Sequence, residues 1–243
     1  MKILSIGNSF SQDAHRYLHK LAKTYGDDFK CVNLCIAGCS LRTHYLNMLA
    51  NNENYYFEFN GENTGIKVSI SQVLASDDWD VVTLQQASWA SAKKETYSPY
   101  IEKLAEYIRK YCPNSKIYIH QTWAYEDGSE RLKVNAGYDS AQKMFFDIQN
   151  AYLIAKDLIN ANGIIPCGEA MLKAIDLGIG KIHRDTLHAA LGTGRYLLAL
   201  TWYKVLTGKD IDNNAFNDFD IPVSKEERAI IIEAVKSVTA KCD

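Results

Sequence analysis

A serine near the N-terminus lies where a reactive hydroxyl group could be presented. The motif G-N-S-F-S at residues 7–11 follows a short apolar run at residues 2–6. A serine on a tight turn between a strand and a helix exposes its hydroxyl, and the helix N-terminus offers free N–H groups to a developing oxyanion. Ser is also a favoured helix N-cap, so on its own the motif fits helix capping by Ser9 or Ser11 at least as well.

An aspartate and a histidine near the C-terminus could complete the chemistry that such a serine needs. Asp185 and His188 are separated by two residues, and residues 189–205 have a helical pattern. On one short loop, the carboxylate can orient the imidazole, which then accepts a proton from a serine hydroxyl. The competing interpretation is that Asp185 caps the helix and His188 begins it.

The elements that must position these residues alternate along the chain. Apolar runs rich in β-branched residues predict strands at residues 2–6, 29–36, 80–84, 116–120 and 163–166. Helical periodicity predicts helices at residues 12–25, 100–111, 137–160, 189–205 and 225–240. This alternation predicts an α/β fold in which a parallel sheet lies between helices. In such sheets, functional residues collect beyond the carboxyl ends of the strands.

Residues 54–70 interrupt the alternation. Alternating apolar residues flank the turn signal Asn60-Gly61, which predicts a small β-hairpin insertion. Because no linker, internal repeat or low-complexity segment divides the chain, residues 1–243 are expected to form a single domain.

Taken together, the G-N-S and D-x-x-H motifs resemble the first and last sequence blocks of the SGNH (GDSL) hydrolase superfamily. The resemblance implies that Ser9 is the nucleophile, His188 the general base and Asp185 its orienting partner. It also implies a three-layer α/β/α, flavodoxin-like fold with about five parallel strands. By the same resemblance, the N–H groups of Ser9 and of Gly38, which follows the second predicted strand, line the oxyanion hole.

The third block of that superfamily differs in this chain. In place of G-x-N-D, the third predicted strand ends in L-Q-Q-A-S at residues 84–88. A Gln amide has the same donor chemistry as Asn, so Gln85 or Gln86 is expected to supply the third oxyanion donor, with Gln85 slightly preferred. The L-Q-Q-A-S and H-Q-T-W motifs are similar to one uncharacterised bacterial subfamily that is often associated with carbohydrate-active enzymes.

Polar and aromatic residues close to the predicted site are candidates for substrate binding. They are Asn8, His44, Gln121, Trp123 and Tyr125. Trp123 and Tyr125 could stack on a sugar ring or line an acyl pocket, and plain packing is an equal alternative. His44 is divided in the same way between substrate contact and a structural role.

The resemblance implies a serine esterase that hydrolyses short acyl esters, such as acetyl esters, of a small molecule or a carbohydrate without a metal or organic cofactor. Three alternatives stay open: an inactive carbohydrate-binding module on the same fold, a lipase or thioesterase of the same superfamily, and a phosphate-binding protein that uses residues 7–11. The helix-spaced pair His15 and His19 has no third ligand nearby, so packing or solvent-facing roles are expected rather than a metal site.

Composition narrows the partners. The chain has 27 basic and 29 acidic residues and a net charge of -2, without a basic cluster, so no nucleic-acid partner is expected. No run of about 18 apolar residues suggests a membrane span. The six Cys residues lack zinc-site spacing and are expected to be reduced core residues. The sequence as it stands predicts a cytoplasmic protein, or a periplasmic or secreted one if a leader has been removed, and predicts no oligomeric state.

Overall fold

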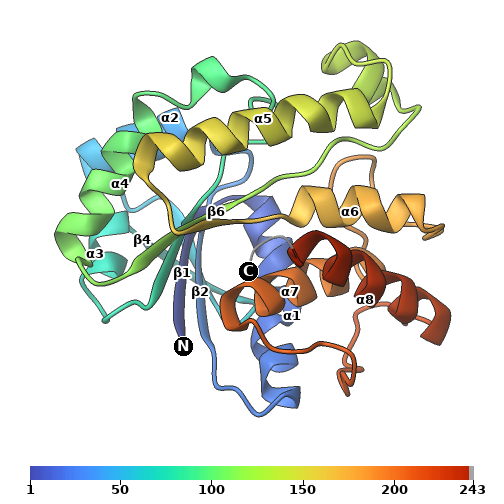
Figure 1. The fold of residues 1–243 in the computed structure, drawn as a ribbon. Helices are drawn as coiled ribbons and strands as arrows, with labels where there is room; N and C mark the ends of the chain where they lie inside the picture. The colour runs from blue at the N-terminus through green and yellow to red at the C-terminus, as the bar shows by residue number, and fades with distance from the viewer. Residues whose placement is uncertain (241–243) are drawn as a thin grey trace.

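The computed structural model describes residues 1–240, and a seven-stranded sheet forms its centre (Figure 1). The spatial order of the strands is β4-β3-β2-β1-β5-β6-β7. Strands β2, β1, β5, β6 and β7 are parallel to one another, whereas β3 and β4 run antiparallel to their neighbours. The predicted sheet of five parallel strands with a hairpin insertion is therefore confirmed. The strands are β1 (Lys2–Gly7), β2 (Lys30–Cys35), β3 (Tyr55–Phe59), β4 (Glu62–Val68), β5 (Val81–Leu84), β6 (Lys116–His120) and β7 (Gly163–Ile165).

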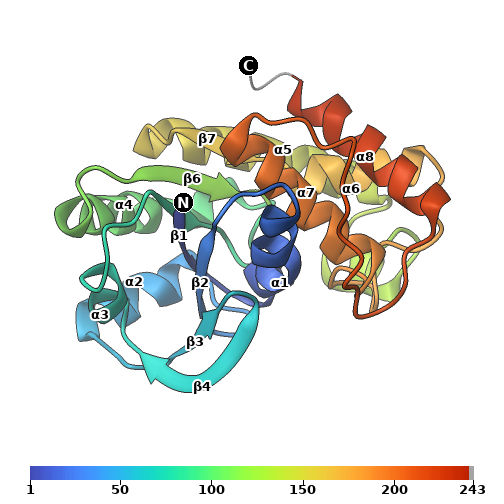
Figure 2. The same ribbon diagram turned by 90° about the horizontal axis from the view of Figure 1, so that it is seen from below.

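Helices cover both faces of the sheet, and each face has its own cluster of buried apolar side chains (Figure 2). One face is covered by α1 (Ser9–Thr24), α6 (Cys167–Asp176), α7 (Thr193–Thr207) and α8 (Lys225–Thr239). The other is covered by α2 (Leu41–Ala50), α3 (Ile70–Leu74), α4 (Tyr100–Tyr111) and α5 (Ala141–Ile159). The arrangement is the expected three-layer α/β/α fold.

Strand β1 lies between β2 and β5, and this position determines where functional residues meet. The chain leaves β1 toward β2 on one side and later returns to place β5 on the other side. Such a reversal of strand order opens a crevice at the carboxyl ends of the strands. Ser9 begins α1 directly beyond the end of β1, so the predicted nucleophile lies at this point of the fold.

The insertion is a tight hairpin that extends the sheet sideways from β2. Asn60 and Gly61 have φ angles of 51° and 87°, as a two-residue type I′ turn requires. Strand β3 pairs with β2, and β4 forms the outer edge with mostly exposed side chains.

Two helices begin later than the sequence predicts. Ser140 accepts a hydrogen bond from the Lys143 N–H and caps α5, so residues 137–140 are not helical. Residues 189–192 belong to a loop, and α7 begins only at Thr193. The sequence did not predict helices α2, α3 and α6. In α2, Leu46 and Leu49 are exposed, so the apolar residues do not lie on one face and the helical pattern is weak.

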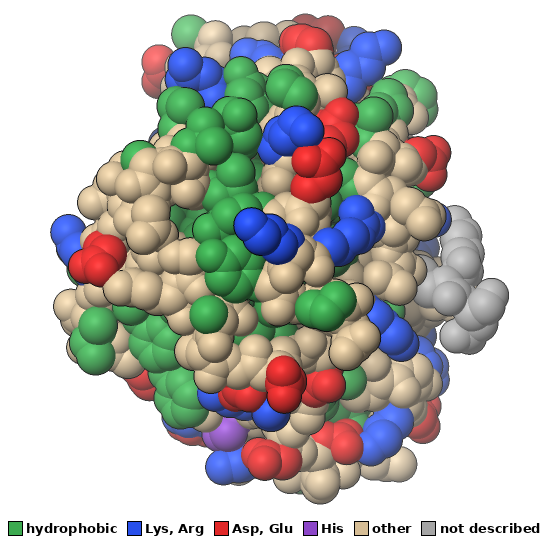
Figure 3. Space-filling view, turned by 90° about the vertical axis from the view of Figure 1, so that its left-hand side faces the viewer, with side chains coloured by type: hydrophobic (Ala, Val, Ile, Leu, Met, Phe, Trp, Pro, Cys, Tyr) green, Lys and Arg blue, Asp and Glu red, His purple; other side chains and the backbone are tan. Residues whose placement is uncertain are grey.

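The distribution of surface charge and the burial of the cysteines agree with what the composition predicts. On the face shown in Figure 3, basic and acidic side chains are interspersed, and neither sign forms a continuous patch. No helix within residues 1–240 is long and apolar enough to cross a membrane. Cys242 lies outside the described residues, and the buried free cysteines are Cys31, Cys35, Cys39, Cys112 and Cys167.

Candidate active site

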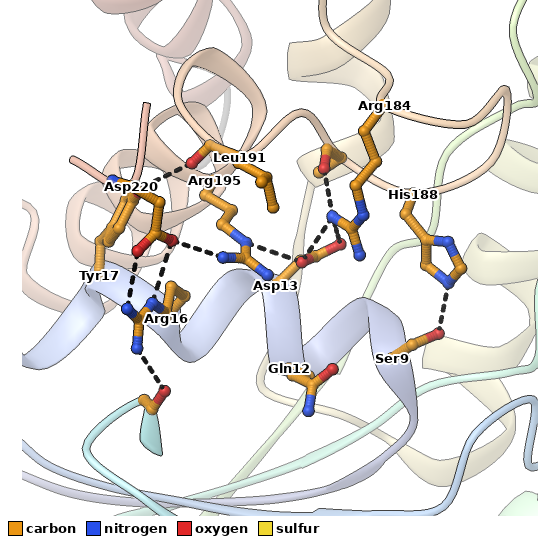
Figure 4. A network of polar contacts seen from close by, with 12 residues as sticks. Ser9, Gln12, Asp13, Arg16, Tyr17, Arg184, His188, Leu191, Arg195 and Asp220 are labelled. Carbon is orange, nitrogen blue, oxygen red and sulfur yellow. Dashed lines mark hydrogen bonds and ion pairs between the residues drawn. The ribbon is translucent and has the colours of Figure 1, made fainter. Parts of the chain in front are cut away.

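The residues predicted to form a triad come together from opposite ends of the chain. The Oγ of Ser9 lies 2.9 Å from Nε2 of His188, and Nδ1 of His188 lies 2.7 Å from Oδ2 of Asp185 (Figure 4 shows the first contact). The second Asp185 oxygen accepts the N–H groups of His188 at 2.7 Å and Leu187 at 3.2 Å. The carboxylate is therefore bound on both oxygens and oriented toward the imidazole.

The protonation state of Asp185 suits that role. Partial burial acts to raise the pKa of Asp185, but the hydrogen bonds from the backbone and side chain of His188 outweigh it and lower the pKa to about 2. At neutral pH the carboxylate is ionised, so it accepts the proton of His188 Nδ1 and leaves Nε2 free to accept the Ser9 proton.

The D-x-x-H motif lies on a compact loop and not at a helix start. In this segment, residues 183–189, here called the triad loop, the Arg184 N–H donates to the His188 carbonyl at 2.9 Å. An isolated β-bridge joins His183 to Ala189, and Thr186 takes a left-handed conformation with φ 65°. Because the next helix begins at Thr193, the alternative that Asp185 caps it does not hold.

Asn8, and not a serine, caps helix α1. Its side chain accepts the N–H groups of Phe10 and Ser11, and the Ser11 hydroxyl accepts the Asn8 N–H at 3.1 Å. The first four N–H groups of a helix have no acceptor within it, and these contacts account for three of them. The remaining one belongs to Ser9, so a free amide lies beside the Ser9 hydroxyl.

Gly38 lies on the loop beyond β2 that is tied to Asn8. The Asn8 side-chain amide donates to the carbonyl of Cys39 at 3.1 Å, which holds the loop against the start of α1. Gly38 is exposed and has a φ of 63°, a left-handed conformation that favours glycine. The loop that carries Gly38, the predicted oxyanion glycine, is thus attached to the residue before Ser9.

The two glutamines after β5 are committed to the scaffold. Both are 1% exposed. The Gln86 amide nitrogen donates to the carbonyl and hydroxyl of Thr96 at 3.1 and 3.0 Å, and its oxygen accepts the N–H groups of Leu41 and Ala87. This set of contacts uses the whole amide, so Gln86 has no hydrogen to offer an oxyanion.

The Gln85 side chain is hydrogen-bonded to Asn8, the residue that precedes Ser9. Its amide nitrogen donates to Oδ1 of Asn8 at 2.6 Å, and its oxygen accepts from Nδ1 of His120 at 2.8 Å. Gln85 therefore supports the residue that caps α1, and its contacts favour positioning over direct contact with an oxyanion.

Trp123 lies under the triad loop rather than facing solvent. Its ring is 1% exposed and stacks on Phe10, with ring centroids 3.9 Å apart. Its indole N–H donates to the carbonyl of Leu187 at 2.8 Å. These contacts favour the packing alternative for Trp123, which supports the loop that carries His188.

The other expected substrate residues are also buried. His44 is fully buried, and its Nδ1 is hydrogen-bonded to the hydroxyl of Tyr55 at 2.8 Å. The Gln121 side chain accepts the N–H of Glu169 at 3.1 Å, and the Tyr125 hydroxyl donates to Ser88 at 3.3 Å. Exposed fractions of 2% for Gln121 and 4% for Tyr125 leave little surface for a ligand, so their positions favour the structural alternative.

An exposed aromatic residue that sequence reasoning missed lies beside Gly38. Trp89, on the loop after β5, is 58% exposed, and its indole N–H is 3.4 Å from the Gly38 carbonyl. Trp89 directly follows L-Q-Q-A-S, but nothing in that spacing shows that it reaches across to the loop after β2. The exposed ring belongs to the edge of the candidate site.

His15 and His19, the two histidines of α1, form hydrogen bonds within the protein. Nε2 of His15 lies 2.7 Å from Oγ of Ser5, and Nδ1 of His19 lies 2.6 Å from the carbonyl of Phe29. Within residues 1–240, no group of three or more His, Cys, Asp and Glu side chains is arranged to hold a metal ion.

Comparisons with known proteins identify the family. A solved protein described as a DUF4886 family protein, from Bacteroides uniformis, is 31% identical and superposes with a TM-score of 0.90, covering 100% of this chain and 96% of that chain. A family model described as a domain of unknown function, DUF4886, matches residues 2–235. This chain belongs to the DUF4886 family. No curated protein matches it.

More distant solved structures share the DUF4886 fold. A member of the lipolytic protein G-D-S-L family from Veillonella parvula has a TM-score of 0.55 at 11% identity, covering 85% of this chain and 98% of that chain. An acetylxylan esterase from Geobacillus stearothermophilus has a TM-score of 0.52 at 15% identity, covering 84% and 92%. At these identities the likeness establishes the fold, which is that of the SGNH (GDSL) hydrolases.

We predict that Gln86→Ala destabilises the protein. The change leaves the buried N–H groups of Leu41 and Ala87 without their acceptor, at a cost of about 1–3 kcal/mol. Urea unfolding measures the loss. The matched control is Gln142→Ala on exposed surface of α5, which is expected to change the free energy of unfolding by less than about 0.5 kcal/mol. Equal effects of the two changes would contradict the structural role of Gln86.

We also predict a loss of stability below about pH 6.5. Burial lowers the pKa of His15, His44 and His120 to about 3 each, and His120 is lowered further by its proximity to His15. Between about pH 6.5 and 3 the unfolded chain binds protons that the folded protein does not, so the free energy of unfolding falls by up to about 1.4 kcal/mol per pH unit for each histidine.

Urea unfolding at pH 7, 6 and 5 measures that slope. His44→Gln is expected to reduce the slope whatever it does to stability at pH 7, because it removes one of the imidazoles whose pKa burial lowers to about 3. An unchanged slope in this variant would rule out His44 as a source of the pH dependence.

Proposed function

We propose that this DUF4886 protein is a serine esterase of the SGNH type. The observation that carries the proposal is the continuous contact from Ser9 to His188 at 2.9 Å and from His188 to Asp185 at 2.7 Å. Helix capping does not explain this arrangement, because Asn8 caps α1 and the triad loop precedes α7 by several residues. Ester hydrolysis also gives a role to the free backbone N–H of Ser9, which can donate to the oxyanion.

In the proposed reaction, His188 accepts the Ser9 proton while Oγ attacks the ester carbonyl. His188 then donates that proton to the leaving alcohol, and the acyl group stays on Ser9. A water molecule, deprotonated by His188, attacks the acyl carbon; the bond to Oγ then breaks, the carboxylic acid leaves, and His188 returns the proton to Ser9. Asp185 stays ionised throughout and stabilises the imidazolium that forms in each half of the reaction.

Main-chain N–H groups are the proposed oxyanion donors. The amide of Ser9 is at the first position of α1, where the helix dipole favours negative charge. The amide of Gly38 is on the adjoining loop, which Asn8 fixes through Cys39. Gln85 acts in this proposal through Asn8, in place of the direct contact expected from the sequence.

The proposed substrates are short acyl esters, in particular acetyl esters, of carbohydrates. The acyl class rests on the resemblance to SGNH hydrolases and on the acetylxylan esterase among the structures of the same fold. The carbohydrate rests on Trp89, whose exposed indole lies beside Gly38 and can pack against the C–H face of a sugar ring.

The esterase proposal is tested with p-nitrophenyl acetate and a fluorophosphonate probe on the wild type and on Ser9→Ala. The wild type is expected to hydrolyse the ester and to be labelled at Ser9. Ser9→Ala is expected to lower kcat by about 10⁴-fold or more and to abolish labelling, because the nucleophile is removed. A wild type that neither hydrolyses the ester nor reacts with the probe would leave the carbohydrate-binding module as the better account.

The role of Trp89 is tested with acetylated xylo-oligosaccharides. Trp89→Ala is expected to raise KM about tenfold, equivalent to ~1.4 kcal/mol of lost packing, while KM for p-nitrophenyl acetate changes little. Trp89→Phe keeps a ring without the N–H and is expected to recover most of the affinity. Tyr111→Ala, an exposed aromatic at the end of α4, is the control. Equal effects of Trp89→Ala on both substrates would refute sugar stacking.

A further inference from the structure

Helix α1 carries a buried carboxylate one turn after the proposed nucleophile. Asp13 has no exposed surface and lies four residues beyond Ser9, on the same side of the helix. Nη1 of Arg184 lies 2.9 Å from both Asp13 oxygens, and Nε of Arg195 lies 2.9 Å from Oδ1 (Figure 4). An unpaired carboxylate is strongly unfavourable at such a position, so these guanidinium groups are a condition for its burial.

Arg184 connects this carboxylate to the triad loop. It directly precedes Asp185, its backbone N–H donates to the His188 carbonyl, and its guanidinium also donates to the carbonyl of Ala189. One side chain therefore closes the loop from residue 184 to residue 189 and attaches it to α1. His188 lies within the closed segment.

Polar contacts thus join the triad loop and α1 at two points one helical turn apart, besides the edge-on contact of the Phe10 ring with His188. The first is the hydrogen bond between Ser9 and His188, which must break and form again in each turnover. The second is the ion pair between Asp13 and Arg184, which takes no part in proton transfer. Only a contact that persists while the first one is broken can keep the imidazole at its distance from Ser9.

Further hydrogen bonds to the loop come from a different part of the fold. Trp123 donates to the Leu187 carbonyl, and the backbone N–H of Glu126 donates to the carbonyl of Thr186 at 3.0 Å. Both donors lie beyond β6, so they set the loop relative to the sheet. Asp13 sets it relative to the helix that carries the nucleophile.

We propose that Asp13 is a positioning residue of the esterase, which holds His188 in register with Ser9 through Arg184. The proposal rests on the proposed function, since it assigns Asp13 a role in that reaction. It predicts that loss of the Asp13 charge lowers the rate of the chemical step more than it lowers substrate binding, because a misplaced base costs about 10²-fold for an error of the order of 1 Å.

Asp220 provides a matched control in the same network. It pairs with Nη2 of Arg16 at 2.7 Å and with Arg195, and its Arg partners lie on α1 and α7 (Figure 4). Hydrogen bonds from Arg16 and Arg195 outweigh partial burial and lower the pKa of Asp220 to about 2, so this carboxylate is ionised at neutral pH. Asp220 therefore ties the same segments of the fold together through arginines that do not belong to the triad loop.

The test compares Asp13→Asn with Asp220→Asn, at a temperature well below the Tm of each, using p-nitrophenyl acetate and active-site titration. Asp13→Asn is expected to lower kcat by about 10- to 100-fold with KM within about twofold, and Asp220→Asn to leave both within about twofold. The double variant Asp13→Asn with Arg184→Gln is expected to lose less than the product of the single losses, because the two residues act as one unit.

Amide hydrogen exchange of residues 183–189 provides a readout that does not depend on activity. Exchange there is expected to speed up in Asp13→Asn and to stay unchanged in Asp220→Asn. Unchanged kcat and loop protection in Asp13→Asn, or equal losses in both variants, would overturn the proposal. A wild type without esterase activity would instead overturn the proposed function, and the exchange comparison would still decide whether Asp13 holds the loop.

Discussion

One buried amide connects the three strand ends on which the candidate site depends. Asn8 follows β1, donates to the loop after β2 through the Cys39 carbonyl, and accepts from Gln85 at the end of β5. The same side chain caps α1 and so determines which N–H groups of the helix are left free. Because a buried amide is costly unless it is hydrogen-bonded, these contacts hold strands β1, β2 and β5 in one arrangement. Because Asn8 directly precedes Ser9 and binds the Cys39 carbonyl, this arrangement holds the loop that carries Gly38 against the start of α1.

The same requirement explains why the polar residues around the site are mostly structural. Gln86 and His44 lie close to the site in sequence and in space, yet their hydrogen bonds go to the protein itself. Side chains of this kind are retained in a core only when their polar atoms are paired, so they rigidify the loops instead of facing a ligand. In the proposed reaction, contact with substrate is left to the half-buried Ser9 and to the exposed Gly38 and Trp89.

Farther along α1, ion pairs attach the helix to the rest of the fold, as hydrogen-bonded amides do near Asn8. Asp13, Arg184, Arg195 and Asp220 alternate in sign and join α1 to the C-terminal third of the chain. The proposed triad therefore forms only when both ends of the chain have folded together, since Ser9 comes from the first helix and His188 from the loop before α7. A long closure of this kind is entropically costly and needs several contacts besides the single hydrogen bond between Ser9 and His188.

The sequence alone determined the α/β architecture and was enough to propose Ser9, His188 and Asp185 as a triad. The alternation of strands and helices and the Asn60-Gly61 turn are local patterns, which can be recognised from the sequence without the fold. The G-N-S and D-x-x-H motifs lie far apart in the chain, and the resemblance to SGNH hydrolases linked them. Only the tertiary structure decided which polar groups are already satisfied. Gln85, Gln86 and Trp123 carry suitable chemistry in suitable places, but their partners Asn8, Thr96 and Leu187 come from other segments of the chain. Burial and hydrogen-bond partners depend on those distant segments, so neither the commitment of Gln86 nor the exposure of Trp89 could be inferred from spacing.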